Sequence, residues 1–119
     1  MIVAGFGCRT GTGTASLRAA LDAATPPRVD ALATLTGKAA LLAPLARALG
    51  LPLLVIDPAD LAHMPTLTCS SASLAAYRTG SVAEAVALAA AGPGARLLAP
   101  RSLSPDRRAT CALASGARA

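Results

Sequence analysis

Aromatic residues are almost absent from this chain of 119 residues: Phe6 and Tyr77 are the only ones, and there is no tryptophan. Proteins that bind single-stranded nucleic acid usually stack its bases on aromatic rings, so that mode of recognition is nearly excluded. Hydrophobic residues still make up 54% of the chain. The core must therefore be built from Leu, Ala and Val, and the length suffices for one compact domain but not for two.

Cysteine is scarce, and no long hydrophobic run is present. The three cysteines, Cys8, Cys69 and Cys111, lie far apart and form no Cys-x-x-Cys motif, which is typical of reduced cytosolic thiols. Every apolar stretch is interrupted before the roughly 20 residues that span a bilayer. Met1 leads directly into an apolar strand pattern, without a leader. We therefore expect a cytoplasmic protein that does not cross a membrane.

Acidic residues are few, which leaves a formal net charge of +5. Ten of the eleven basic residues are arginine, and they are spread from Arg9 to Arg118 without forming a run. Dispersed guanidinium groups fit a small ligand with several negative charges better than they fit DNA. The composition thus predicts an anionic small-molecule partner, and neither nucleic acid nor a membrane is expected.

Alternating apolar segments and turn signals predict a three-layer α/β/α sandwich. Because a polar loop over residues 100–108 joins the last two strands, we expect them to pair antiparallel in a mixed, mainly parallel sheet of about five strands. One domain is expected over residues 1–114, with a loose tail over 115–119. The predicted strands are 2–6, 29–35, 53–56, 96–99 and 109–114, and the predicted helices are 15–24, 38–49, 73–77 and 81–91, with a short turn over 59–62 capped by Asp57.

A glycine-rich segment follows the first strand. It reads Gly5-Phe6-Gly7-Cys8-Arg9-Thr10-Gly11-Thr12-Gly13. Glycines allow the backbone to approach a ligand closely, and Arg9 offers a planar fork to a carboxylate or phosphate. The spacing does not match G-x-G-x-x-G, and no P-loop lysine follows, so a nucleotide site is disfavoured. A tight turn without a ligand is the alternative interpretation.

Lys38 is the only lysine, and it follows the second strand at the predicted start of a helix. Ligands of open α/β sheets bind at the carboxyl ends of the parallel strands, where both Lys38 and the glycine-rich segment are expected. A cation at the positive end of a helix dipole is unfavourable, so an anion held between them is one interpretation. A solvated surface lysine is the other.

Several short motifs follow one another in a specific order. They are the segment from Gly5 to Gly11, Ala33-Thr34 with Lys38, Leu49-Gly50-Leu51-Pro52-Leu53, Gly80-Ser81-Val82-Ala83-Glu84-Ala85 and the terminal strand from Ala109 to Ala114. Together they resemble the CobE family of small cobalamin-biosynthesis proteins, which is similar to the C-terminal domain of CbiG. The resemblance covers nearly the whole chain.

The resemblance implies work on a corrin-ring precursor in tetrapyrrole metabolism. In the CbiG relatives a lactone of the macrocycle is hydrolysed and a two-carbon fragment leaves as acetaldehyde. The stand-alone CobE members belong to the aerobic route, where such a hydrolase step is not evidently required, so binding and hand-over of an intermediate is an equal alternative. The chain has no room for the rest of a full CbiG, which favours the stand-alone type. Outside the family, a basic α/β module for another polyanion remains open.

Corrinoid precursors carry acetate and propionate groups around their rim, which dispersed cations and backbone amides would recognise. The resemblance makes Glu84 the candidate catalytic residue, able to position water or move a proton, but a capping box with Ser81 also explains it. Relatives often carry lysine where this chain has Arg101, which cannot serve as a titrating base. The expected substrate-binding residues are Gly5, Gly7, Cys8, Arg9, Gly11, Thr12, Lys38, Gly80, Ser81 and Arg101.

Neither a metal site nor a bound cofactor is expected. His63, the only histidine, could ligate the cobalt of a bound ring, but a surface position beside Met64 is the simpler interpretation. No His is placed by sequence to activate Ser81 or Cys8, so no nucleophilic triad is predicted. The expected partners are a corrinoid or precorrin small molecule and other enzymes of the cobalamin pathway.

Overall fold

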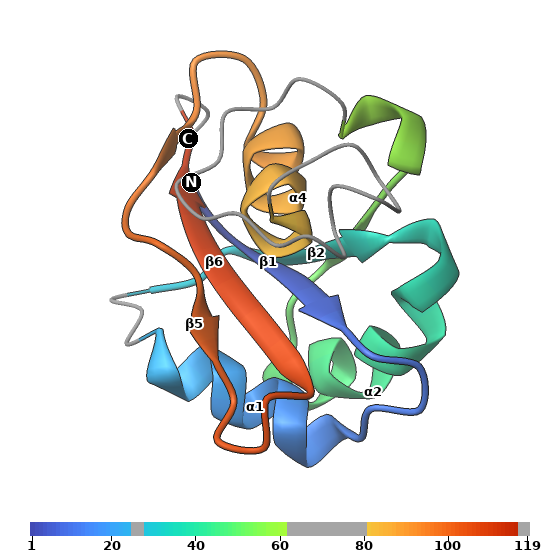
Figure 1. Cartoon of the computed structure of the whole chain (residues 1–119). Helices are drawn as coiled ribbons and strands as arrows, with labels where there is room; N and C mark the ends of the chain where they lie inside the picture. The colour runs from blue at the N-terminus through green and yellow to red at the C-terminus, as the bar shows by residue number, and fades with distance from the viewer. Residues whose placement is uncertain (25–27, 62–80, 117–119) are drawn as a thin grey trace.

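The structure is a computed structural model that describes residues 1–24, 28–61 and 81–116 (Figure 1). His63, Cys69, Tyr77, Gly80 and the helix predicted over residues 73–77 lie outside the described residues. The strands are β1 (Ile2–Cys8), β2 (Ala31–Leu35), β3 (Leu53–Ile56), β4 (Arg96–Leu97), β5 (Ser102–Leu103) and β6 (Ala109–Ser115). The helices are α1 (Thr14–Ala23), α2 (Ala39–Leu49) and α4 (Val82–Ala91), with short 3₁₀ turns η1 (Thr36–Lys38) and η2 (Pro58–Asp60).

The strands form one mixed sheet in the order β3-β2-β1-β6-β4, and β5 pairs with β6. β1, β2 and β3 are parallel, whereas β6 runs antiparallel to β1 along its whole length, from Ile2 opposite Ser115 to Cys8 opposite Ala109. β4 and β6 are antiparallel, as predicted. The prediction that residues 100–108 form only a loop is wrong, because β5 lies within them. A strand of two residues is too short to show an alternating pattern.

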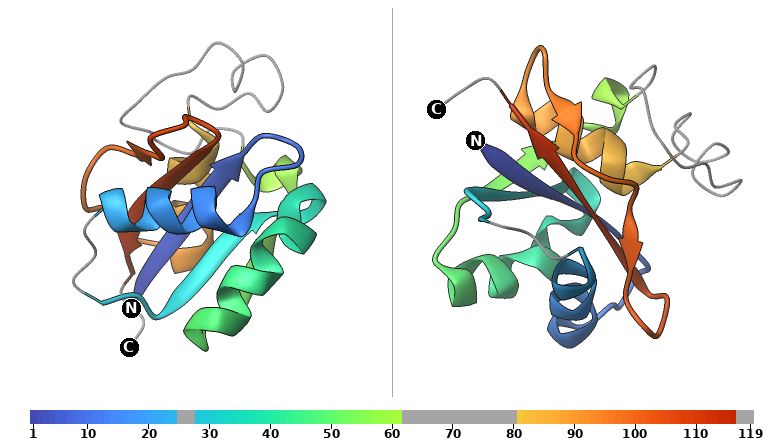
Figure 2. Two further views of the ribbon diagram at one scale, coloured as in Figure 1. Left: turned by 90° about the horizontal axis from the view of Figure 1, so that it is seen from below. Right: turned by 90° about the vertical axis from the view of Figure 1, so that its left-hand side faces the viewer.

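Helices cover both faces of the sheet, which confirms the predicted sandwich. Figure 2 shows α1 and α2 on one face and α4 on the other. Alternate residues of β1 serve the two cores: Ala4 and Phe6 pack with α1 and α2, while Val3 packs with α4. Apart from Phe6, the buried apolar side chains among the described residues are Leu, Ala, Val and Cys, as the composition requires.

The ends of several elements follow local sequence signals. α2 ends at Gly50, whose φ of +67° is left-handed, and the N–H of Leu51 donates to the carbonyl of Ala46 at 3.0 Å in a Schellman arrangement. The Asp57 carboxylate accepts the N–H of Ala59 at 2.9 Å and caps η2, as predicted. Strand β1 extends two residues beyond its predicted end at Phe6 and reaches Cys8.

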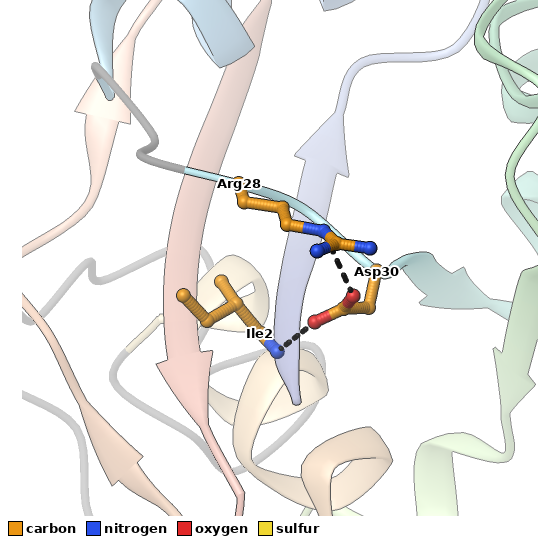
Figure 3. A network of polar contacts seen from close by, with 3 residues as sticks. All are labelled: Ile2, Arg28 and Asp30. Atoms are coloured by element: carbon orange, nitrogen blue, oxygen red, sulfur yellow. Dashed lines mark hydrogen bonds and ion pairs between the residues drawn. The ribbon is translucent and has the colours of Figure 1, made fainter. Parts of the chain in front are cut away.

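Asp30 joins the amino ends of β1 and β2 (Figure 3). Its Oδ2 accepts the N–H of Ile2 at 2.8 Å, its own N–H donates to the carbonyl of Ile2 at 2.8 Å, and its Oδ1 lies 3.7 Å from Nε of Arg28. At the same end, the N–H of Gly116 donates to the carbonyl of Met1 at 2.9 Å. The sheet therefore extends through Ser115 into the segment predicted as a tail.

None of the helices in the described part of the chain is long and apolar enough to span a membrane.

Candidate functional site

The segment after β1 forms a tight, internally bonded turn at the carboxyl edge of the sheet. The N–H of Thr12 donates to the carbonyl of Arg9 at 3.1 Å, and its Oγ1 donates to the same carbonyl at 2.6 Å. Gly11 has a φ of +79°, which favours glycine, and no atom lies near the place of its missing Cβ. Thr12 is only 2% exposed, so its side chain shapes the turn, while Arg9, Thr10 and Gly11 are exposed.

Lys38 lies next to this turn. Its Nζ donates to Oγ1 of Thr10 at 3.2 Å, so the loops that follow the adjacent parallel strands β1 and β2 are in direct contact. Lys38 is half-buried, and the two residues before it, Thr36 and Gly37, are exposed. The carboxyl ends of parallel strands are where α/β sheets place their ligands, and the structure brings the two predicted cation-bearing loops together at that edge.

Two helices begin at this edge without a side-chain cap, α1 directly and α2 through the preceding turn η1. Gly13 precedes α1 and Lys38 precedes α2, and neither helix has a side-chain cap or an acidic residue in its first turn. α4, in contrast, is capped by Ser81, whose Oγ accepts the N–H of Glu84 at 3.3 Å. The first-turn N–H groups of α1 carry partial positive charge that no side-chain cap uses, which suits an anionic ligand. At the start of α2, in contrast, the N–H of Ala39 donates to the carbonyl of Thr36 in η1.

Gly5 lies inside β1, within the predicted strand, and Gly7 also lies inside β1, one residue beyond the predicted end of that strand. A Cβ on Gly5 would lie 2.4 Å from the carbonyl oxygen of Ala83 and 2.5 Å from the backbone N of Ala87. A Cβ on Gly7 would lie 2.9 Å from Oγ1 of Thr110. The close approach of α4 to β1 therefore explains Gly5, whereas at Gly7 the neighbouring Thr110 side chain of β6 limits the space.

Glu84 is fully buried in the first turn of α4. Its Oε2 accepts the backbone N–H of Arg101 at 2.9 Å, so it ties the connection between β4 and β5 to the helix. Arg101 makes this contact through its main chain, and its side chain is half-buried. Ser81 and Glu84 form the half of the predicted capping box in which the hydroxyl accepts the helix N–H. These contacts give Glu84 a structural role, and its catalytic role stays a prediction.

The two described thiols are poor nucleophiles at neutral pH. Burial raises the pKa of Cys8, an effect that the charge of Lys38 partly opposes, and burial also raises the pKa of Cys111 well above its ordinary value. Thiols become reactive when their pKa is lowered, so neither cysteine resembles an activated nucleophile. Within residues 1–24, 28–61 and 81–116, no three His, Cys, Asp or Glu side chains are grouped as a metal site.

The sequence analysis missed the turn between β5 and β6, which packs against the glycine-rich segment. The N–H of Arg9 donates to the carbonyl of Arg108 at 3.0 Å, and Oγ1 of Thr12 lies 3.3 Å from the same oxygen. Asp106 holds this turn and has a pKa lowered to about 2, first through the hydroxyl of Ser104 and then through that of Ser16. The pattern Ser-Pro-Asp signals a turn, but no local signal predicts its distant neighbours.

These features define a class: a small α/β protein that carries basic side chains on the loops after its parallel strands. The family model described as "Cobalamin synthesis G C-terminus" matches residues 2–114. The chain belongs to this CbiG C-terminal family, which confirms the resemblance seen in its motifs, and it is a cobalamin-biosynthesis protein.

Solved structures agree with this assignment. CobE, a protein from the cobalamin (vitamin B12) biosynthetic pathway, is 37% identical with a TM-score of 0.83, over 96% of this chain and 89% of CobE. The cobalamin biosynthesis protein chiG from Agrobacterium tumefaciens is 34% identical with a TM-score of 0.73, over 99% of this chain and 100% of chiG. A cobalamin biosynthesis protein G homologue from Sulfolobus solfataricus, 16% identical with a TM-score of 0.73, shares the fold over 95% of this chain and 36% of its own. No curated protein sequence matches the chain.

Proposed function

We propose that this protein binds a corrin-ring intermediate of cobalamin biosynthesis through the carboxylates on the rim of the macrocycle. The observation that carries the proposal is the contact between Lys38 and Thr10, which joins the loops after β1 and β2. Beside it lie Arg9, which is exposed, and the uncapped first turn of α1. Carboxylates are the groups that guanidinium forks, ammonium groups and free helix N–H groups bind best.

The charges at this edge are available to a ligand. In the described part of the chain the ion pairs are Arg18 with Asp22 and Arg28 with Asp30. Arg9 and Lys38 therefore have no internal carboxylate partner among these residues. The near absence of aromatic side chains also fits recognition at the charged rim of the ring better than stacking on its face.

Binding and hand-over is favoured over catalysis of lactone opening. A catalytic Glu84 would have to position water or move a proton, yet its Oε2 accepts the main-chain N–H of Arg101 and its carboxylate is fully buried. Lactone opening with release of acetaldehyde is the second candidate, because this buried carboxylate lies at the N-terminus of α4 near the end of β1.

Titration of the protein with cobyrinic acid, followed by the visible spectrum of the corrinoid, tests the proposal. Wild type is expected to perturb the spectrum, and Arg9→Ala and Lys38→Ala are each expected to weaken binding by about tenfold, since each removes one charged hydrogen-bonding group. Arg96→Ala is the matched control: it removes the same charge from β4, whose Arg96 pairs in register with Ser115 at the opposite end of the sheet. Absence of binding by wild type would contradict the proposal, as would equal affinity of all four proteins.

The same samples separate the two candidates, with a precorrin lactone as the ligand. The binding proposal expects the lactone to be recovered unchanged. Release of acetaldehyde by wild type but not by Glu84→Gln would show lactone opening instead.

A further inference from the structure

Two arginines in the turn between β5 and β6 lie at the same edge of the sheet as Arg9 and Lys38. Arg107 and Arg108 are exposed, and the carbonyl of Arg108 accepts the N–H of Arg9 at 3.0 Å. β6 lies beside β1 on the side opposite β2. The glycine-rich segment after β1 therefore has the β5–β6 turn on one side and Lys38 on the other. We call the four residues Arg9, Lys38, Arg107 and Arg108 the basic edge.

The β5–β6 turn is held firmly in place. The N–H of Arg107 donates to the carbonyl of Ser104 at 2.9 Å, and Oγ of Ser104 accepts the N–H of Ala109 at 3.1 Å. Oδ1 of Asp106 accepts the hydroxyl of Ser104 at 2.5 Å and the N–H of Arg108 at 3.1 Å, and Oδ2 accepts the hydroxyl of Ser16 at the start of α1. Hydrogen bonds therefore fix the backbone of the turn from which the side chains of Arg107 and Arg108 extend.

The backbone of this turn does not account for an arginine at position 107. Arg107 has a φ of +59° and is the only residue other than glycine with a positive φ among the described residues. Glycine adopts this conformation more readily than a residue with a Cβ. Residues in such conformations concentrate at functional sites, where the side chain itself is needed.

The charges of the basic edge are not balanced within the described part of the chain. None of its four residues belongs to an ion pair there. Asp106 is the one acid on the loops that carry them, and its carboxylate interacts with the charge of Arg108 as well as with hydroxyl and main-chain donors. One negative charge therefore stands against four positive ones. Four like charges on adjacent loops repel one another, and a ligand with several negative charges relieves that repulsion.

We propose that Arg107 and Arg108 form, with Arg9, a second carboxylate subsite that sets the specificity of the protein for ligands with widely spaced free carboxylates. The basic edge spans the three neighbouring strands β6, β1 and β2, which is about 10 Å at ordinary strand spacing. One carboxylate or phosphate cannot reach across that distance, whereas groups on different sides of a macrocycle can. The inference rests on the proposed function, because it assigns a second contact to the same ligand.

Cobyrinic acid and its fully methyl-esterified derivative are the probes. Wild type should bind the acid much more tightly than the ester. Arg107→Gly and Arg108→Gln should each weaken binding of the acid by about tenfold, with little effect on the ester. Arg107→Gly is informative because glycine suits the backbone at that position: thermal unfolding should show it to be at least as stable as wild type. Arg96→Gln, with the same loss of charge at the far end of the sheet, should bind within about twofold of wild type.

The outcomes separate this inference from the proposed function. If wild type binds the acid and the two turn variants bind it as tightly as Arg96→Gln does, the second subsite is wrong while the proposed function stands. Equal affinity of wild type for acid and ester overturns both proposals, because it shows that the carboxylates are not what the protein recognises. If wild type binds neither probe, both proposals fail.

Discussion

Gly5 lies where the backbone of α4 crosses β1, and its hydrogen atom is all that fits there. Val3, Gly5 and Gly7 occupy alternate positions of β1 and face α4. On this face of β1 the side chains therefore become smaller from Val3 to Gly5 and Gly7, toward the end of the strand that lies at the N-terminus of α4. At the scale of single residues, a glycine that looks like part of a ligand loop is explained by helix packing.

Replacing Gly5 with alanine should destabilise the protein strongly. The new Cβ would lie 2.4 Å and 2.5 Å from backbone atoms of α4, which cannot move as a flexible side chain could, so we expect the free energy of unfolding to fall by about 3 kcal/mol or more. Urea denaturation followed by circular dichroism measures the change. Gly37→Ala is the control, because no atom lies within 4 Å of its Cβ position and its φ is not positive. Equal stability of the two variants would contradict the packing explanation.

At the scale of elements, Asp106 connects the β5–β6 turn to helix α1. Its carboxylate accepts hydrogen bonds from Ser104 within the turn and from Ser16 in the first turn of α1. These bonds favour the ionised form, which is why its pKa is lowered to about 2 from an ordinary value of 3.8.

This connection should make stability depend on pH in the acid range. Because the pKa is lower in the folded state, the stabilisation by Asp106 is complete above its unfolded value near 3.8 and is lost as the pH falls toward 2. The difference in unfolding midpoint between wild type and Asp106→Asn should thus be constant above about pH 5 and shrink below about pH 4. Thermal unfolding from pH 2 to 7 measures it. A difference that does not vary over this range would show that the carboxylate bonds do not favour the ionised form.

At the scale of the whole molecule, the two hydrophobic cores share one sheet. Leu17 belongs to the core between the sheet and α1 with α2, and Leu88 belongs to the core under α4. Strand β1 contributes side chains to both cores, and β6 pairs with it along its full length. Loss of either core therefore removes support from the same central strands.

Truncations in the two cores should lower one common unfolding transition. Leu17→Ala and Leu88→Ala are each expected to cost about 2–4 kcal/mol through lost burial and the cavity left behind, with a single cooperative transition in both variants. Scanning calorimetry provides the test, through agreement of the calorimetric and van't Hoff enthalpies. Two separate transitions in either variant would show that the layers unfold independently.

Signals that act over a few residues were enough to predict most elements. Gly50 ends α2, Asp57 caps η2 and Ser81 caps α4 because each uses partners within five residues along the chain. Strand β5, the reason for Gly5 and the role of the β5–β6 turn could not be predicted in this way. Thr12 and Arg108, for example, are 96 positions apart.

The sequence by itself determined the alternation of strands and helices, the aliphatic core, the excess of positive charge and, through the order of its motifs, the family. Only the tertiary structure decided which cations share an edge. Lys38 was expected at the carboxyl edge of the sheet from the parallel order of β1 and β2. Arg107 and Arg108 lie at that edge because the last strand, β6, lies beside the first strand, β1. Strand order depends on how both faces of the sheet are buried at once, a property of the whole chain that no local pattern encodes.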